Sequence, residues 1–198
     1  MKKLMKDLDD VEMARIRRIA VLGSGKVREK DPAYQQAVRL GQALAQEGST
    51  VIHGGFRGVM EAVAKGSRLG GGYNVGVTIQ KPNSKPGFKT GRQSQDLIRV
   101  NPWVDAEIKM PCWQSRLFRL IEMGDAYVFL DGATGTLAEF FVVLEMTNRG
   151  LLKKPIIVLG KKLDSLIRSL KKNPHFELPR RLAFATSVTQ AIRTLERV

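Results

Sequence analysis

The sequence predicts an α/β protein: a Rossmann-like, doubly wound, mainly parallel sheet with helices on both faces. Two observations carry this prediction. Short, wholly apolar runs such as residues 19–22 and 126–130 are typical of strands that are buried on both faces, and they alternate with segments of helical periodicity. Several of these runs also end in a glycine-rich turn, as strands do where a parallel sheet passes into a helix.

The first 80 residues are expected to hold three strands and two helices. Asp31 and Pro32 suit the N-cap and first turn of a helix, in which apolar side chains recur at helical spacing until Gly48 ends it. The strands are expected over 19–22, 50–53 and 73–79, and the helices over 32–47 and 58–68.

The second part of the chain is expected to begin with a long loop over residues 80–95, which are rich in Pro, Gly and Lys. Ser187 suits the N-cap of a last helix. We expect residues 1–17 to form an arm and residues 18–198 a single domain. The remaining strands are expected over 97–100, 126–130, 155–159 and 182–185, and the helices over 113–123, 136–149 and 163–172.

The composition excludes several classes of protein. A single cysteine, Cys112, rules out an internal disulfide framework and suits a reducing compartment. Neither His53 nor His175 has metal-ligand spacing with it, so no metal site is expected. The chain has no apolar run near the roughly 18 residues of a membrane span and no secretory h-region, so we expect a cytoplasmic protein without a membrane partner.

The net charge of +14 is unevenly distributed. Residues 149–198 hold twelve Lys or Arg against three Asp or Glu, which contributes +9. A solvated basic surface explains this bias, and no helix-turn-helix pattern or aromatic-interleaved basic stretch accompanies it, so a nucleic-acid partner is not expected. Nucleic-acid binding through the basic C-terminal third remains an alternative.

Three glycine-bearing turns follow strands whose carboxyl ends should meet at one edge of the sheet, where α/β proteins bind ligands. Glycines let backbone N–H groups approach a ligand, and a helix N-terminus favours negative charge. The turns therefore predict a site for a phosphorylated small molecule. The turn at residues 23–25 is not a dinucleotide fingerprint, because Arg28 occupies the position of the third glycine in G-x-G-x-x-G. The candidate binding residues are Gly23, Ser24, Gly54, Gly55, Arg57, Gly58, Gly132, Ala133, Thr134, Gly135 and Thr136.

Some residues near these turns have two interpretations. Glu139, about one turn into the helix, is either a candidate acid or base or a carboxylate placed by the helix dipole. Asp131 suits a ligand contact or a turn and capping role equally well. We expect His53 to be a satisfied strand-end residue, and Cys112 and Trp113 to pack in the interior.

Two segments resemble the motifs of a known family. HGGFRGVMEAVAKGS (53–67), followed by GGGYNVGVTI (70–79), is similar to the G-G-x-x-G-[VL]-M segment of the LOG family. DAYVFLDGATGTLAE (125–139) resembles its second motif, P-G-G-x-G-T-x-x-E. Members are often labelled lysine decarboxylase-like, and the characterised ones are nucleoside 5′-monophosphate phosphoribohydrolases that activate cytokinins. A related branch holds molybdenum cofactor carrier proteins, which bind a phosphate-bearing pterin and catalyse nothing.

The resemblance covers roughly residues 18–160. It implies that Arg116 and Glu139 are the catalytic pair of such enzymes and that Gly132, Gly135 and Thr136 bind phosphate. It further implies a homodimer or higher oligomer with the site near the interface, no required cofactor, and a bound nucleotide or molybdopterin-type ligand.

The chain departs from the motifs of the enzymes at three positions. Asp131 and Ala133 replace Pro and the second Gly, and Leu117 replaces a basic residue after Arg116. The Cβ of Ala133 and the charge of Asp131 would disturb an anion site. The departures favour a non-catalytic carrier or sensor of the molybdenum-cofactor-carrier type, with a phosphoribohydrolase as the alternative. Lysine decarboxylation is not expected, because nothing marks a Schiff-base lysine.

Overall fold

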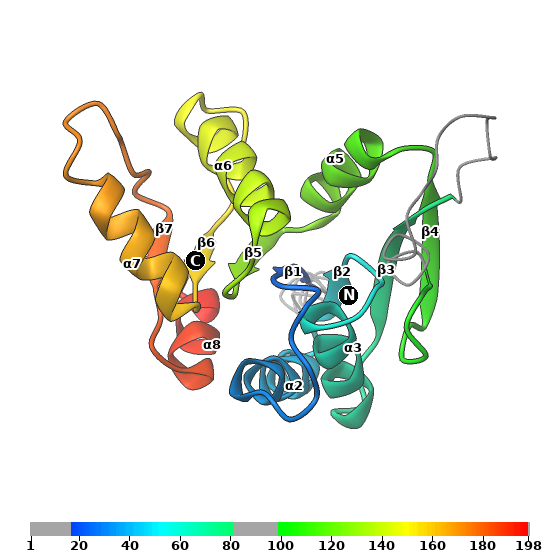
Figure 1. The fold of residues 1–198 in the computed structure, drawn as a ribbon. Coiled ribbons are helices and arrows are strands. Elements are labelled where there is room, and N and C mark those ends of the chain that lie inside the picture. The colour runs from blue at the N-terminus through cyan, green and yellow to red at the C-terminus, as the bar shows by residue number, and fades with distance from the viewer. Residues whose placement is uncertain (1–16, 81–98, 198) are drawn as a thin grey trace, which may run out of the picture.

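A computed structural model describes residues 17–80 and 99–197, which form a seven-stranded sheet with helices on both faces (Figure 1). Every strand pair in it is parallel, and the strand order is β4-β3-β2-β1-β5-β6-β7. The prediction of a Rossmann-like α/β fold is therefore confirmed.

The elements of the first half agree with those expected from the sequence. They are β1 (Arg18–Leu22), α2 (Pro32–Gln46), β2 (Thr50–His53), α3 (Val59–Leu69) and β3 (Asn74–Ile79). The second half contains β4 (Ala106–Met110), α5 (Trp113–Met123), β5 (Ala126–Phe129), α6 (Thr134–Asn148), β6 (Ile156–Val158), α7 (Lys161–Leu170), β7 (Leu182–Phe184) and α8 (Val188–Glu196).

The sheet separates two apolar cores. Helices α2, α3 and α8 pack on one face, where Ile19 and Val21 of β1 contribute, and α5, α6 and α7 pack on the other, against Ala20 and Leu22. The pleat of β1 sends alternate side chains to opposite faces, so a strand covered on both sides must be apolar at every position.

The strand order creates a switch point beside β1. From β1 the chain adds β2, β3 and β4 outward, and then α5 returns it to β5 on the other side of β1. Crossovers therefore leave β1 and β5 toward opposite faces, and the turns after these strands border a crevice at the carboxyl edge. This arrangement positions the candidate site.

The helices and strands of the structure differ from the expected ones in three places. No strand is present at residues 99–100, and the rest of the strand expected over 97–100 lies outside the described residues, as do most of the expected loop and residues 1–16 of the arm. The strand β4 was missed, because as an edge strand it alternates partly buried and exposed residues and contains charges. Helix α6 begins at Thr134, two residues earlier than expected.

Candidate functional site

A cavity of about 430 Å³ lies at the carboxyl edge of the sheet, where the turns after β1, β2 and β5 meet. Helices α5 and α6 complete its wall. The lining residues are Val21, Leu22, Gly23, Ser24, Gly25, Lys26, Gly54, Phe56, Met60, Ile79, Trp113, Arg116, Ala133, Thr134, Gly135, Thr136 and Glu139.

One side of the cavity is the N-terminus of α6. Ala133 is its N-cap, and no side chain caps the helix there. The N–H groups of a helical first turn have no intrahelical partner, and together with the helix dipole they favour an anion. Gly132 is required at the start of this turn, because a Cβ there would lie 2.1 Å from the Thr136 hydroxyl oxygen.

Asp131 and Ala133, two of the three departures from the family motifs, leave the N-terminus of α6 open to the cavity. The Asp131 carboxylate accepts a hydrogen bond of 2.9 Å from the backbone N–H of Leu163, in the first turn of α7, and Asp131 is absent from the cavity lining. Asp131 therefore caps α7 and does not line the cavity. Ala133 has a φ of −101°, a conformation that any L-residue adopts without strain.

The guanidinium of Arg116 forms part of the cavity wall. Its Nε donates to the carbonyl of Val77 at 2.8 Å and its Nη2 to that of Gly54 at 3.0 Å, while the ring of Phe56 lies 5.2 Å away. A Cβ on Gly54 would come 1.9 Å from Nη2 and 2.5 Å from the sulfur of Met60, so the side chains of Arg116 and Met60 would have to shift. Burial lowers the pKa of Arg116, against the influence of Glu139.

Glu139 projects from α6 toward Arg116, with Oε1 3.8 Å from Nη1 of the guanidinium. Both side chains are nearly buried, at 13% and 8% exposure. Burial raises the pKa of Glu139 to about 7, although the positive charge of Arg116 opposes the shift. Burial thus moves the pKa of this carboxyl toward neutrality, which suits a side chain that accepts and donates a proton.

The turn after β2 packs against the turn after β1. Gly55 and Gly58 have positive φ values of 78° and 71°, and a Cβ on Gly58 would lie 2.3 Å from the carbonyl oxygen of Ser24. The N–H of Val59 donates to that same carbonyl at 2.9 Å. Gly58 thus lies where the two turns that border the cavity meet, whereas Gly55 packs against Thr78 and Gly76 of β3.

The structure brings most of the predicted site residues to one cavity. Four of them are not among its lining residues: Gly55, Gly58 and Gly132 shape the surrounding turns, and Arg57 is exposed. The others line it: Gly23, Ser24, Gly54, Ala133, Thr134, Gly135, Thr136, Arg116 and Glu139.

Sequence reasoning missed the apolar wall formed by Phe56, Met60, Ile79 and Trp113. The prediction that Cys112 and Trp113 pack in the interior was wrong: both are exposed, Trp113 by 45%, because they begin α5 at the rim of the cavity. Trp113 precedes Arg116 by three residues, and helical residues at this spacing share a face. That spacing was the available signal.

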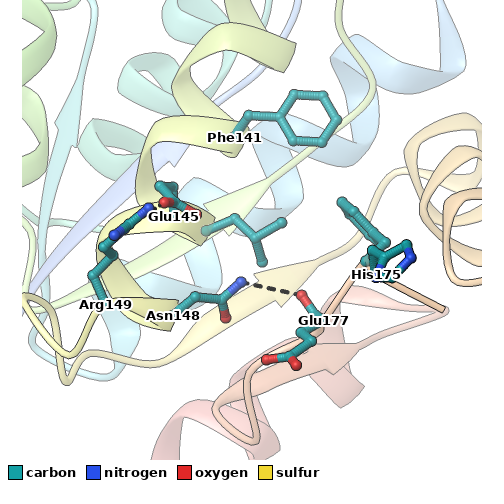
Figure 2. A pocket seen from close by; sticks show the side chains of 8 residues that line it. Phe141, Glu145, Asn148, Arg149, His175 and Glu177 are labelled. Atoms are coloured by element: carbon teal, nitrogen blue, oxygen red, sulfur yellow. Dashed lines mark hydrogen bonds and ion pairs between the residues drawn. The ribbon is translucent and has the colours of Figure 1, made fainter. Parts of the chain in front are cut away.

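A second hollow of about 600 Å³ lies at the opposite half of α6, beside the segment that precedes β7 (Figure 2). Glu145 and Arg149 pair at 2.6 Å, and the amide of Asn148 donates to the carbonyl of Glu177 at 3.2 Å. This hollow combines carboxylates with the carboxyl half of a helix, where an anion is disfavoured. Its lining residues are Phe141, Leu144, Glu145, Asn148, Arg149, His175, Phe176 and Glu177.

No group of three or more His, Cys, Asp or Glu side chains within residues 17–80 and 99–197 is arranged to hold a metal ion. In the same part of the chain, no helix has the length and apolarity needed to cross a membrane.

The chain matches a known protein family over most of its length. The model of the SLOG cluster4 family matches residues 16–191. This protein belongs to the SLOG cluster4 family. The resemblance to LOG proteins is thereby confirmed, and curated sequences agree. A cytokinin riboside 5′-monophosphate phosphoribohydrolase of Rhodococcoides fascians is 30% identical over 127 residues, which are 64% of this chain and 59% of that one.

Further relatives come from plants and archaea. The cytokinin riboside 5′-monophosphate phosphoribohydrolase LOG of Oryza sativa subsp. japonica is 30% identical over 150 residues, covering 74% of this chain and 56% of the relative. The chain thus spans less than two thirds of the length of these two enzymes. An uncharacterised Archaeoglobus fulgidus protein is 29% identical over 75% of this chain and 88% of its own length.

Solved structures support the same fold. The molybdenum cofactor binding protein of Rippkaea orientalis has a TM-score of 0.67 at 24% identity, covering 92% of this chain and 97% of that one. The molybdenum cofactor carrier protein of Chlamydomonas reinhardtii has a TM-score of 0.68 at 23% identity, with 92% and 98% covered.

Proposed function

We propose that this protein binds a nucleotide or a related phosphorylated ligand, such as a molybdopterin-type molecule, and acts as a carrier or sensor. The observation that carries the proposal is the convergence of the uncapped N-terminus of α6 and the glycine turn after β1 on one cavity of about 430 Å³. The phosphate is placed at the first turn of α6, close to Gly135 and Thr136, where backbone N–H groups and the dipole favour negative charge.

The apolar wall suits the rest of such a ligand. Phe56, Met60, Ile79 and Trp113 offer flat or flexible apolar surface to a heterocyclic ring. A site with an anion-binding end and an aromatic end favours a molecule that joins a phosphate to a base or a pterin over inorganic phosphate.

The role of Arg116 favours a carrier or sensor over an enzyme. Two of its nitrogens donate to backbone carbonyls, so much of its hydrogen-bonding capacity serves the architecture of the wall. Arg116 and Glu139, which form part of the cavity wall and pair their charges, are sufficient for binding a ligand. The similarity to molybdenum cofactor carrier proteins supports the same choice.

The second candidate is a nucleoside 5′-monophosphate phosphoribohydrolase. The buried Glu139, with a pKa of about 7 and Arg116 beside it, favours this function, as does the preserved anion end. In that reaction the C1′–N bond breaks through an oxocarbenium-like state. Water then bonds to C1′ as the Glu139 carboxylate accepts its proton, and the base leaves with a proton from solvent.

We further propose a homodimer or higher oligomer in the cytoplasm. Helix α6 carries apolar side chains around most of its circumference, and Val142 is only partly buried. Phe118 on the neighbouring α5 is 49% exposed. A second copy of the chain, packed over α5 and α6, would cover this surface close to the cavity.

The deciding experiment measures binding and turnover of AMP by the same protein. Equilibrium dialysis gives the affinity, and chromatography after incubation detects free adenine and ribose 5-phosphate. Binding without products supports the carrier or sensor. Turnover that is abolished in Glu139→Gln supports the hydrolase. Glu145→Gln is the control, because Glu145 is an exposed carboxylate on the same helix and lines the second hollow instead of the cavity. Absence of both binding and turnover with AMP and with pterin phosphates would contradict the proposal.

A further inference from the structure

The turn after β2 is held by a buried set of hydrogen bonds on its outer side. The N–H of Gly55 donates to Nδ1 of His53 at 3.1 Å. The side-chain amide of Asn101 donates to the carbonyls of Gly55 and Phe56, at 3.0 and 2.9 Å. His53, with no exposed surface, and Asn101, at 5%, are both buried. These hydrogen bonds hold the backbone of the turn from buried side chains that do not line the cavity.

The hydrogen bonds of Asn74 determine the tautomer of His53. Nδ2 of Asn74 donates to the carbonyl of Trp103 at 3.0 Å and to a carboxylate oxygen of Asp105 at 2.6 Å, so its Oδ1 is the atom that faces the imidazole. Nε2 of His53, 2.9 Å from that oxygen, must then carry the proton. Nδ1 is left as the acceptor that the N–H of Gly55 requires.

The same turn holds the guanidinium of the ligand cavity. The carbonyl of Gly54 accepts from Nη2 of Arg116 at 3.0 Å, and a Cβ on Gly54 would lie 1.9 Å from that nitrogen and displace it. A change in the Gly54–Gly55 peptide therefore moves the hydrogen-bond acceptor that orients Arg116. His53 contacts this peptide from the side away from Arg116, and it is absent from the cavity lining.

We propose that His53 is a positioning residue: as a neutral imidazole protonated on Nε2, it fixes the Gly54–Gly55 turn and through it the guanidinium of Arg116, and it thereby sets the affinity of the cavity for the phosphorylated ligand. The last step rests on the proposed function. Burial is the main reason that the pKa of His53 falls to about 4, so the imidazole keeps an unprotonated Nδ1 throughout the physiological range. The charged groups that act on it, Arg116 and Asp105, have opposite effects.

Two variants of the full chain separate positioning from simple packing. His53→Asn keeps an oxygen that accepts from the N–H two residues later, as in an Asx turn, but loses the bond to Asn74. His53→Phe fills the space and loses both bonds. Ser67→Ala is the matched control, because Ser67 is also fully buried and its hydroxyl has no hydrogen-bond partner.

The first readout needs no ligand. In wild-type protein, ¹⁵N NMR of the imidazole is expected to report the Nε2–H tautomer from pH 5 to 8. Hydrogen exchange of the Gly55 amide and of Nε–H of Arg116 is expected to quicken at least about tenfold in His53→Phe, to stay within about threefold in His53→Asn, and to remain unchanged in Ser67→Ala. An Nδ1–H or charged imidazole in wild-type protein would overturn the proposal even if His53→Phe failed to fold.

The second readout compares AMP with adenosine. His53→Phe is expected to weaken AMP binding about tenfold and adenosine binding much less, and His53→Asn is expected to restore AMP affinity to within about threefold of wild type. Equal loss of both ligands, or no rescue by asparagine, would assign His53 a packing role. If wild-type protein binds no AMP, the proposed function fails, while the tautomer and the exchange rates still decide whether His53 positions Arg116.

Discussion

Replacing Asp131 with alanine separates its role as a helix cap from a role at the ligand. The Asp131 carboxylate accepts from the N–H of Leu163 at 2.9 Å, and its negative charge lies at the N-terminus of α7. Loss of such a cap costs about 1 kcal/mol, and loss of the favourable charge about 0.5 kcal/mol more. Asp131→Ala should therefore lower the free energy of unfolding by about 1.5 kcal/mol, and Asp131→Asn, which keeps an acceptor, by about 0.5 kcal/mol.

Urea unfolding followed by circular dichroism measures these differences, and the melting temperature of Asp131→Ala should fall by about 3–6 °C for a chain of this size. The affinity for AMP should stay within about twofold of wild type, because the carboxylate faces α7 and not the cavity. Unchanged stability together with tighter AMP binding would contradict the capping role, because it would mean that the charge of Asp131 opposes the bound anion.

Three further predictions concern the cavity. The pKa of Glu139 is raised in the folded protein, so its contribution to stability is fully present below its unfolded pKa, near pH 4.5, and is lost as the pH rises through about 7. Denaturation of wild type and Glu139→Gln at pH 5 and pH 8 should show this loss of stability in wild type alone. An equal change of stability with pH in both proteins would contradict it. Gly54→Ala forces a Cβ to within 1.9 Å of Arg116. It should lower the free energy of unfolding in urea by about 1–3 kcal/mol and weaken AMP binding at least tenfold. Wild-type stability and wild-type affinity in this variant would mean that Arg116 lies elsewhere. Trp113 is exposed at the rim, so AMP should quench its fluorescence, whereas a signal that survives in Trp113→Phe would come from Trp103.

Most strands and helices could be predicted, because a strand that is buried on both faces has an apolar residue at every position. Residues 19–22 and 126–130 are apolar at every position, which follows from a strand covered by helices on both sides. The edge strand β4 leaves no such record. Its sequence, AEIKM, is half exposed, and its charged residues resemble those of a loop or a helix.

The candidate site was predictable in its anion end and less so in its apolar wall. Glycine spacing marks a turn whose backbone must approach something closely, and Gly132 and Gly54 are such positions. Phe56 and Met60 look in the sequence like any core residue, because only the fold decides which apolar side chains border a cavity. The direction of a short side chain is equally undetermined: Asp131 turned out to cap a helix that follows it by thirty residues.

The protonation state of Glu139 could not be predicted from sequence either. A carboxylate one turn into a helix is usually stabilised by the dipole, which would keep its pKa low. Here the side chain lies between the core and Arg116, and desolvation outweighs the nearby positive charge. This balance depends on burial, which the spacing of residues in a motif does not specify.

We propose that a phosphorylated ligand binds at the N-terminus of α6. A titration of ¹⁵N-labelled protein with AMP tests it most directly. We expect saturable shifts that are largest for the amides of Gly135, Thr136 and Ser24, with little change for adenosine at the same positions. Shifts confined to the second hollow around Asn148, or spread over the basic residues of the C-terminal third and abolished by salt, would contradict it.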